Sequence, residues 1–212
     1  MENPVIIFGA NYLGRSAKEI FESNKVEVYG FLDDDRKLHN TEMDDAKVLG
    51  GTDDDGFLKL IGKKCEAFVA VDDNRLRKSL VKFIQEVRHK QPVNAIHAGA
   101  SISSRAEIGH GNFIDRGAIV AMGAKVGNHN LINSLAMVGV DVKLGDFVQV
   151  GSGSLINPGV TIDDEVFIGS GVTIVAGVHV GTGARIGAGS VVIASVKANE
   201  TVFGNPAQKV KS

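Results

Sequence analysis

The sequence predicts an α/β domain followed by a β-helix, which is a solenoid of short parallel strands. Short continuous apolar runs alternate with a helical pattern in the first part of the chain. From Ile96 to Val192, a branched aliphatic residue stands at every sixth position, seventeen times in succession and without an insertion. A fixed short period of this kind is the signature of a solenoid. The change in composition near residue 93 predicts two domains, 1–92 and 93–212, and the second ends in a C-terminal tail.

The first domain is expected to contain a parallel sheet. Val5–Phe8 and Val26–Leu32 are apolar runs with a helical pattern between them, an order that predicts a right-handed βαβ unit. Ala67–Val71 predicts a further buried strand, and the polar run 72–74 can cap the helix after it. That helix is expected to bury Leu76, Leu80, Ile84 and Val87.

Candidate ligand-binding residues follow these strands, because ligands of such sheets bind at the carboxyl ends of the strands. The turn Gly9–Gly14 opens a helix and offers backbone N–H groups to a phosphate. Asp33, at the tip of the second strand, can bind ribose or base hydroxyls. The alternative is a tight turn followed by solvated charges. NAD chemistry is disfavoured, because the sequence offers no catalytic partner for it.

The repeats restrict two further positions. The residue four places after each aliphatic is small or narrow, as Ala118, Ala136 and Val160 illustrate. The residue directly after the aliphatic is often glycine, and there we expect turns with positive φ. The glycines at this position are Gly109, Gly127, Gly139, Gly145, Gly151, Gly169, Gly181 and Gly187. Three six-residue repeats make one coil of 18 residues.

Composition excludes several classes of function. The net charge of −2 gives no electrostatic footprint for nucleic acid or an anionic membrane. The single cysteine, Cys65, excludes an internal disulfide framework and a multi-cysteine zinc site, and we expect no metal. No apolar stretch reaches the length of a membrane span, and the N-terminus reads as a strand instead of a signal peptide. We therefore expect a soluble cytoplasmic protein without membrane insertion.

Several motifs together resemble a known family. They are Ile7-Phe8-Gly9-Ala10 with Gly14, Gly30-Phe31-Leu32-Asp33-Asp34, Asp73-Asn74-Arg75-Leu76-Arg77, Ala95-Ile96-His97, the repeats, and Gly204-Asn205-Pro206-Ala207. The chain resembles bacterial sugar O-/N-acyltransferases of the NeuD/PglD type, in which a Rossmann-like βαβ domain precedes a left-handed parallel β-helix of hexapeptide repeats. The resemblance implies an acetyltransferase of surface glycan biosynthesis. It also implies a homotrimer, with acetyl-CoA as cosubstrate bound between neighbouring β-helices and a nucleotide-linked amino or deoxy sugar held by the first domain.

The resemblance also implies two sets of binding residues. The nucleotide-linked sugar is expected at Gly9, Ala10, Asn11, Gly14, Asp33, Asp34, Asn74 and Arg75. Acetyl-CoA is expected at Gly153, Gly159, Gly171, Asn205, Pro206 and Ala207. The turn 204–207 can instead be a mere chain end after the last coil.

The catalytic pair of the family is incomplete in this chain. Family members carry His-Glu or His-Asp just before a segment that here is 144–147, so the pair falls on Val140 and Asp141. A second family histidine matches Gln149, and Pro158, one coil after Val140, has no N–H for a thioester oxygen. Two hypotheses follow. The chain is an acyltransferase of reduced activity in which Asp141 is the remaining catalytic residue, or it is a non-catalytic trimeric protein that binds nucleotide sugar and CoA or serves as a scaffold.

Overall fold

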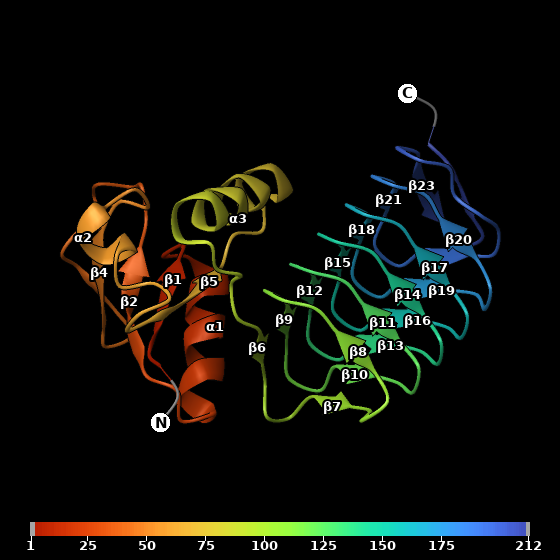
Figure 1. Cartoon of the computed structure of the whole chain (residues 1–212). Coiled ribbons are helices and arrows are strands. Elements are labelled where there is room, and N and C mark those ends of the chain that lie inside the picture. The colour runs from red at the N-terminus through yellow and green to blue at the C-terminus, as the bar shows by residue number, and fades with distance from the viewer. Residues whose placement is uncertain (1–2, 211–212) are drawn as a thin grey trace. The chain divides into compact units, whose positions relative to one another are not determined.

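The computed structural model describes residues 3–210, so the first two and the last two residues of the predicted domains lie outside it. The chain forms two compact units, Met1–Ala98 and Gly99–Ser212 (Figure 1). Among the described residues, every helix belongs to the first unit. None of these helices is both long and apolar enough to cross a membrane.

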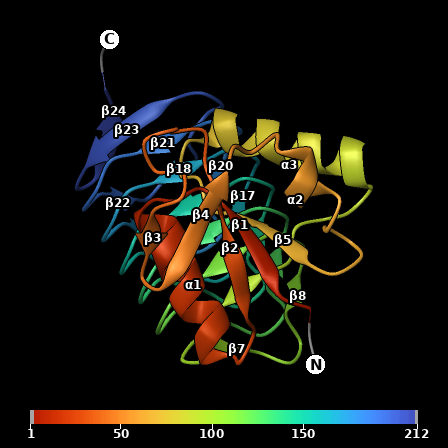
Figure 2. The same ribbon diagram turned by 90° about the vertical axis from the view of Figure 1, so that its left-hand side faces the viewer.

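The first unit is an α/β domain built on a sheet with the strand order β3-β4-β2-β1-β5 (Figure 2). Its strands are β1 (Val5–Phe8), β2 (Val28–Leu32), β3 (Glu42–Met43), β4 (Ala46–Gly50) and β5 (Glu66–Val69). Its helices are α1 (Tyr12–Ser23), α2 (Asp55–Leu58) and α3 (Asn74–Arg88), and a short strand, β6 (Ala95–Ile96), ends the unit. All pairings are parallel except that of β3 with β4. Because β1 lies between β2 and β5, the strand order reverses beside β1, and this is the switch point of the sheet.

Helix α3 buries a face that differs from the predicted one. Leu80 and Ile84 are buried as expected, but Leu76 is 47% exposed and Val87 is 44% exposed. The position one turn before Leu80 and Val81 is taken by Arg77, which is fully buried. The sequence argument failed here because it assigned only apolar side chains to the packed face.

The second unit is a left-handed β-helix in three sheets, and all of its strands before β23 are two residues long. The β7 sheet contains β7 (Ser101–Ile102), β10 (Ile119–Val120), β13 (Met137–Val138), β16 (Leu155–Ile156), β19 (Thr173–Ile174) and β22 (Val191–Val192). The β8 sheet contains β8 (Glu107–Ile108), β11 (Lys125–Val126), β14 (Lys143–Leu144), β17 (Thr161–Ile162) and β20 (His179–Val180). The β9 sheet contains β9 (Phe113–Ile114), β12 (Leu131–Ile132), β15 (Gln149–Val150), β18 (Phe167–Ile168), β21 (Arg185–Ile186), β23 (Thr201–Gly204) and β24 (Ala207–Lys209).

Register and burial follow the six-residue rule. Val120 pairs with Val138 and Val138 with Ile156, which confirms a coil of 18 residues. The aliphatics from Ile114 to Val192 are all buried, and so are the small residues four places after them, from Ala118 to Val196. In the first coil, Ile102 and Ile108 are only half-buried, because that coil has a neighbouring coil on one side only.

The glycines directly after the aliphatics do not have the expected positive φ. Glycine is needed at these positions for a steric reason, because a Cβ on Gly109, Gly127 or Gly151 would lie 2.4–2.6 Å from atoms of the next coil. Positive φ occurs two residues later, at every sixth residue from Gly111 to Gly189. Nine of these positions are glycine, and the others are His129, Leu135, Asp141, Phe147 and Glu165.

Candidate functional site

Val140 and Asp141 lie in a turn between β13 and β14. We call this turn, together with the turns stacked on it in the neighbouring coils, the Asp141 corner. The N–H of Asp141 donates to Met122 O (3.1 Å) in the coil before, and the N–H of Gly159 donates to Val140 O (2.9 Å) from the coil after. These bonds stack the turn containing Pro158 on Val140, as the 18-residue coil predicts. The residues that the sequence places together are therefore neighbours at this corner.

Asp141 has the geometry of an exposed carboxylate on a rigid turn. Its φ of 56° lies in the left-handed region, which costs a residue with a Cβ about 1–2 kcal/mol. Its Oδ1 lies 2.1 Å from the place where a Cβ of Gly123 would be, so a side chain at position 123 would displace this carboxylate. Val140 is half-buried and brings no titratable group. Beyond Gly159, the corner continues to Gly177, where nothing lies within 4 Å of a Cβ position. The corner thus offers one carboxylate beside a smooth, open surface.

Of the other predicted residues of the second unit, Gly159 lies at this corner, whereas Gln149, Gly153 and Gly171 lie away from it within one chain. Gln149 is on β15 in the β9 sheet, between Leu131 and Phe167. Gly153 and Gly171 are at the corner between the β9 and β7 sheets, so the whole β7 sheet separates them from Gly159. One chain does not bring the predicted CoA-binding glycines together.

The C-terminal turn is a hairpin tied to the last coils. Strands β23 and β24 pair antiparallel around Asn205 and Pro206, which are joined by a cis peptide bond. The N–H of Gly204 donates to Ser190 Oγ (3.1 Å). Asn205 and Pro206 are exposed and Ala207 is half-buried, so part of this predicted CoA-binding turn is open to a ligand.

In the first unit, the turn after β1 is tightly packed. Gly9 has a φ of 113°, and a Cβ on it would lie 2.5 Å from Ala70 O. A Cβ on Gly14 would lie 2.1 Å from Gly9 O. Both glycines are therefore required by close backbone approach, whatever else they do.

Four backbone N–H groups of this turn already have acceptors within the protein. The N–H of Gly9 donates to Leu32 O (2.8 Å), and the N–H of Ala10 donates to Asp33 Oδ2 (2.8 Å). Asn11 caps α1, since its Oδ1 accepts the N–H groups of Leu13 (2.8 Å) and Gly14 (3.2 Å). A phosphate bound by these amides would have to displace bonds that hold the turn.

The carboxylates of Asp33 and Asp34, predicted to bind the nucleotide sugar, accept hydrogen bonds from neighbouring loops. Asp33 Oδ1 accepts the N–H of Asp35 (2.8 Å), while its Oδ2 holds Ala10. Asp34 Oδ1 accepts both the N–H (2.9 Å) and the hydroxyl (2.8 Å) of Thr52. Of the predicted pair after β5, Asn74 accepts a bond from Arg77, and Arg75 is exposed.

The sequence predicts ligand-binding segments at Gly9–Gly14 and Asp72–Arg75, but it assigns no role to the side chains of Tyr12, Asp72 and Arg77. The phenol of Tyr12, after β1, donates to Asp72 Oδ2, after β5. Its hydrogen bond to Asp72, with burial and the carboxylate charge, raises the pKa of Tyr12 to about 12. Arg77 donates to Val71 O (2.7 Å) and Asp72 O (3.1 Å), and burial lowers its pKa to about 10. No local pattern relates residues that are 60 positions apart, although an aromatic residue within a glycine turn is unusual enough to flag.

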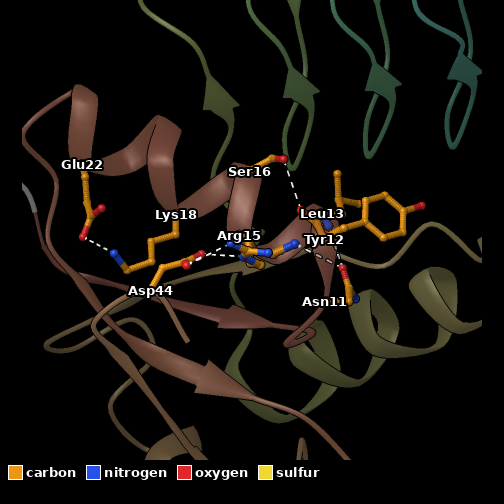
Figure 3. Close-up of polar contacts among 9 residues, drawn as sticks. Asn11, Tyr12, Leu13, Arg15, Ser16, Lys18, Glu22 and Asp44 are labelled. Atoms are coloured by element: carbon orange, nitrogen blue, oxygen red, sulfur yellow. Dashed lines mark hydrogen bonds and ion pairs between the residues drawn. The ribbon is translucent and has the colours of Figure 1, made fainter. Parts of the chain in front are cut away.

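A cavity of about 560 Å³ runs along α1 beside the switch point (Figure 3). Its lining consists of Tyr12, Arg15, Ser16, Lys18, Glu19, Glu22, Asp44 and Asp45. Arg15 makes a two-point contact with Asp44 (2.5 and 3.0 Å), and Lys18 pairs with Glu22 (2.6 Å). The hydrogen bond from Arg15 lowers the pKa of Asp44. Four carboxylates face two cations here, so the cavity disfavours phosphate. The residues described contain no cluster of three or more potential metal ligands.

Comparisons with known proteins agree with this architecture. A family described as the PglD N-terminal domain matches residues 4–84, and the bacterial transferase hexapeptide (six repeats) matches 141–175 and 159–194. No curated protein sequence matches the chain significantly.

Solved structures similar to the whole chain include three bacterial proteins. A His-to-Asn variant of perosamine N-acetyltransferase from Caulobacter crescentus, in complex with CoA and GDP-perosamine, has a TM-score of 0.90 and 26% identity, covering 100% of this chain and 99% of that chain. The acetyltransferase domain of PglB from Neisseria gonorrhoeae, in complex with acetyl coenzyme A, has a TM-score of 0.90 and 26% identity, covering 99% and 100%. WeeI from Acinetobacter baumannii has a TM-score of 0.85 and 25% identity, covering 98% and 99%.

The fold and the repeats first define the class, a hexapeptide-repeat acyltransferase. The N-terminal match and the similarity across both units define it further. Together these findings support a sugar acyltransferase of the NeuD/PglD type.

Proposed function

We propose that the protein transfers an acetyl group from acetyl-CoA to a nucleotide-linked amino or deoxy sugar for surface glycan synthesis in the cytoplasm. The observation that carries the proposal is the similarity over both units to proteins solved with CoA and GDP-perosamine or with acetyl-CoA. A match to the β-helix alone would support acyl transfer but not a nucleotide sugar. The first unit then holds the sugar nucleotide and the second unit carries the transfer.

Asp141 is the residue to which we assign proton transfer. The amine or hydroxyl of the sugar attacks the thioester carbonyl, its proton passes to Asp141 directly or through a water, and the C–S bond breaks to release CoA. The thiolate takes up one proton as it leaves. Histidine suits this role because its ordinary pKa lies near the working pH, and this corner has no histidine. The expected reaction is therefore slow compared with one assisted by histidine.

A homotrimer is part of the proposal, and the outward side of the β7 sheet supports it. Four of its six strands present an apolar residue, namely Ile119, Met137, Leu155 and Val191, with Ile119 43% and Leu155 41% exposed, and the other two present Ser101 and Thr173. The corresponding positions of the β8 sheet are polar, namely Glu107, Lys125, Lys143, Thr161 and His179. An exposed apolar stripe on the side of a solenoid favours self-association on that side. It would also unite the two corners that carry Gly153 and Gly159.

We expect Leu155→Asp to break this assembly, because burying an unpaired carboxylate at an interface is strongly unfavourable. Light scattering should report three times the 22.4 kDa chain mass for the wild type and a single chain for the variant. The matched control is Thr161→Asp on the polar β8 sheet, which should leave the trimer intact. An unchanged mass for Leu155→Asp would remove the β7 sheet from the interface.

The second candidate is a protein that binds both ligands without turnover. Val140 and Pro158 favour it, since neither the side chain of Val140 nor the backbone of Pro158 can supply the base or the N–H donor that acyl transfer uses.

Thermal shift followed by a thiol-release assay separates the two candidates. We expect acetyl-CoA to raise the melting temperature, because a ligand that binds only the folded state stabilises it. Thiol release that depends on an added UDP-, GDP- or CMP-linked amino sugar supports the enzyme. Binding of both ligands without release supports the second candidate, and failure of acetyl-CoA to bind contradicts both.

A further inference from the structure

The switch point of the first unit has a polar contact that the proposed binding residues do not include. It joins the segment Gly9–Tyr12, after β1, to the segment Ala70–Asp73, after β5. Asn11 Nδ2 donates to Ala70 O (2.9 Å), and Tyr12 donates to Asp72. In open α/β sheets, ligands bind where the strand order reverses, and these segments flank that place.

Tyr12 differs from its neighbours in exposure and orientation. Its side chain is 66% exposed, whereas Leu13 and Gly14 are buried. Tyr12 lies at the edge of the cavity along α1, and Figure 3 shows its ring turned away from Arg15 and Lys18. The ring is nevertheless held at one end, because its hydroxyl donates to Asp72.

The neighbouring candidates for ligand contact are occupied by structural bonds. Asp33 holds Ala10 and Asp35, Asp34 holds Thr52, and the amides of Leu13 and Gly14 are capped by Asn11. Asp72 is exposed on the segment after β5, so a ligand hydroxyl at the switch point can reach its carboxylate beside Tyr12. The aromatic ring adds a flat surface on which a base can stack.

We infer that Tyr12 and Asp72 form the nucleoside-recognition contact of the first unit. The base of a nucleoside diphosphate stacks on the Tyr12 ring, and a ribose hydroxyl donates to Asp72, whose orientation Tyr12 fixes. Asp33 and Asp34 then act as positioning residues for the loops. This inference rests on the proposed function, because it takes a nucleotide sugar as the ligand.

Isothermal titration of the full chain with GDP and with UDP tests the contact. For the nucleotide that binds the wild type, Tyr12→Ala should weaken binding about 5- to 150-fold, the range of base stacking on aromatic residues. Tyr12→Phe, which keeps the ring, should lose less than Tyr12→Ala, and Asp72→Asn should weaken binding about tenfold. Tyr29→Ala is the matched control, since Tyr29 is the chain's other tyrosine, is 44% exposed and lies on β2, and it should not change the affinity.

An absorbance titration at 295 nm tests the pair without any ligand. The ionisation of the Tyr12 phenol is identified as the one that is absent in Tyr12→Phe. It should lie near pH 12 in the wild type and at lower pH in Asp72→Asn, because the hydrogen bond to Asp72 stabilises the neutral phenol. The same ionisation in both proteins would contradict the contact in solution.

The binding outcomes separate this inference from the proposed function. If GDP or UDP binds the wild type and binds Tyr12→Ala as tightly or more tightly, the pair blocks the switch point instead of recognising a nucleoside, and only this inference fails. If neither nucleotide binds the wild type, this inference fails together with the sugar-nucleotide part of the proposed function. Thiol release with an amino sugar as acceptor would still identify an acyltransferase.

Discussion

Val140→His should raise the rate of CoA release by about 10²-fold or more, because a positioned general base contributes about 10²–10⁴-fold. The substituted imidazole would stand next to Asp141, at a turn held on both sides by backbone bonds to Met122 and Gly159. Histidine has its pKa near working pH, and an adjacent carboxylate can stabilise the imidazolium that forms. The measurement is thiol release at saturating acetyl-CoA and sugar nucleotide, as a function of pH.

The control for this substitution is Val140→Gln, which brings a polar side chain of similar reach but no base. It should show no gain, and the gain of Val140→His should follow the titration of a group with a pKa near 6.5. Adding Pro158→Gly to Val140→His returns a backbone N–H and should raise the rate further, by at most the 10²–10³-fold that one such donor supplies elsewhere. If Val140→His is no faster than Val140→Gln, the Asp141 corner is not the reaction site.

The β-helix could be predicted from the sequence because its physical rule is local and repeats. Each coil buries its side chains only against the coils above and below, so one hexad such as Ile132 to Ala136 already shows which positions face inward. The role of the glycines could not be read in the same way. Gly151 and Gly153 are both plausible turn residues, but in the fold Gly151 avoids a collision with the next coil while Gly153 has a positive φ.

The candidate site was less predictable because its contacts join distant segments. The corner of Val140, Asp141 and Pro158 could be located, since the coil length fixes which residues stack. At the switch point, a glycine turn and an acidic residue at a strand end predict where a ligand binds. The hydrogen-bond partner of each polar group there depends on tertiary structure. Asp33 reaches back to Ala10, and Asp72 receives Tyr12. Neither contact has a signature in the local sequence.

The structure gives the two kinds of glycine different expected costs, which a matched pair of substitutions can measure. In Gly151→Ala the new Cβ would lie 2.4 Å from Gly169 C and from Ser170 N. These are backbone atoms of the next coil, and Gly169 is itself held by a bond from its N–H to Ile186 O (2.8 Å). The coils would have to separate locally, so we expect a loss of about 3 kcal/mol in the free energy of unfolding.

In Gly153→Ala nothing lies within 4 Å of the new Cβ, and only the φ of +67° is unfavourable, so we expect a loss of about 1 kcal/mol. Chemical denaturation of both variants at equal protein concentration measures the difference, since the stability of an oligomer depends on concentration. Equal losses would mean that contact between coils does not determine where this β-helix needs glycine.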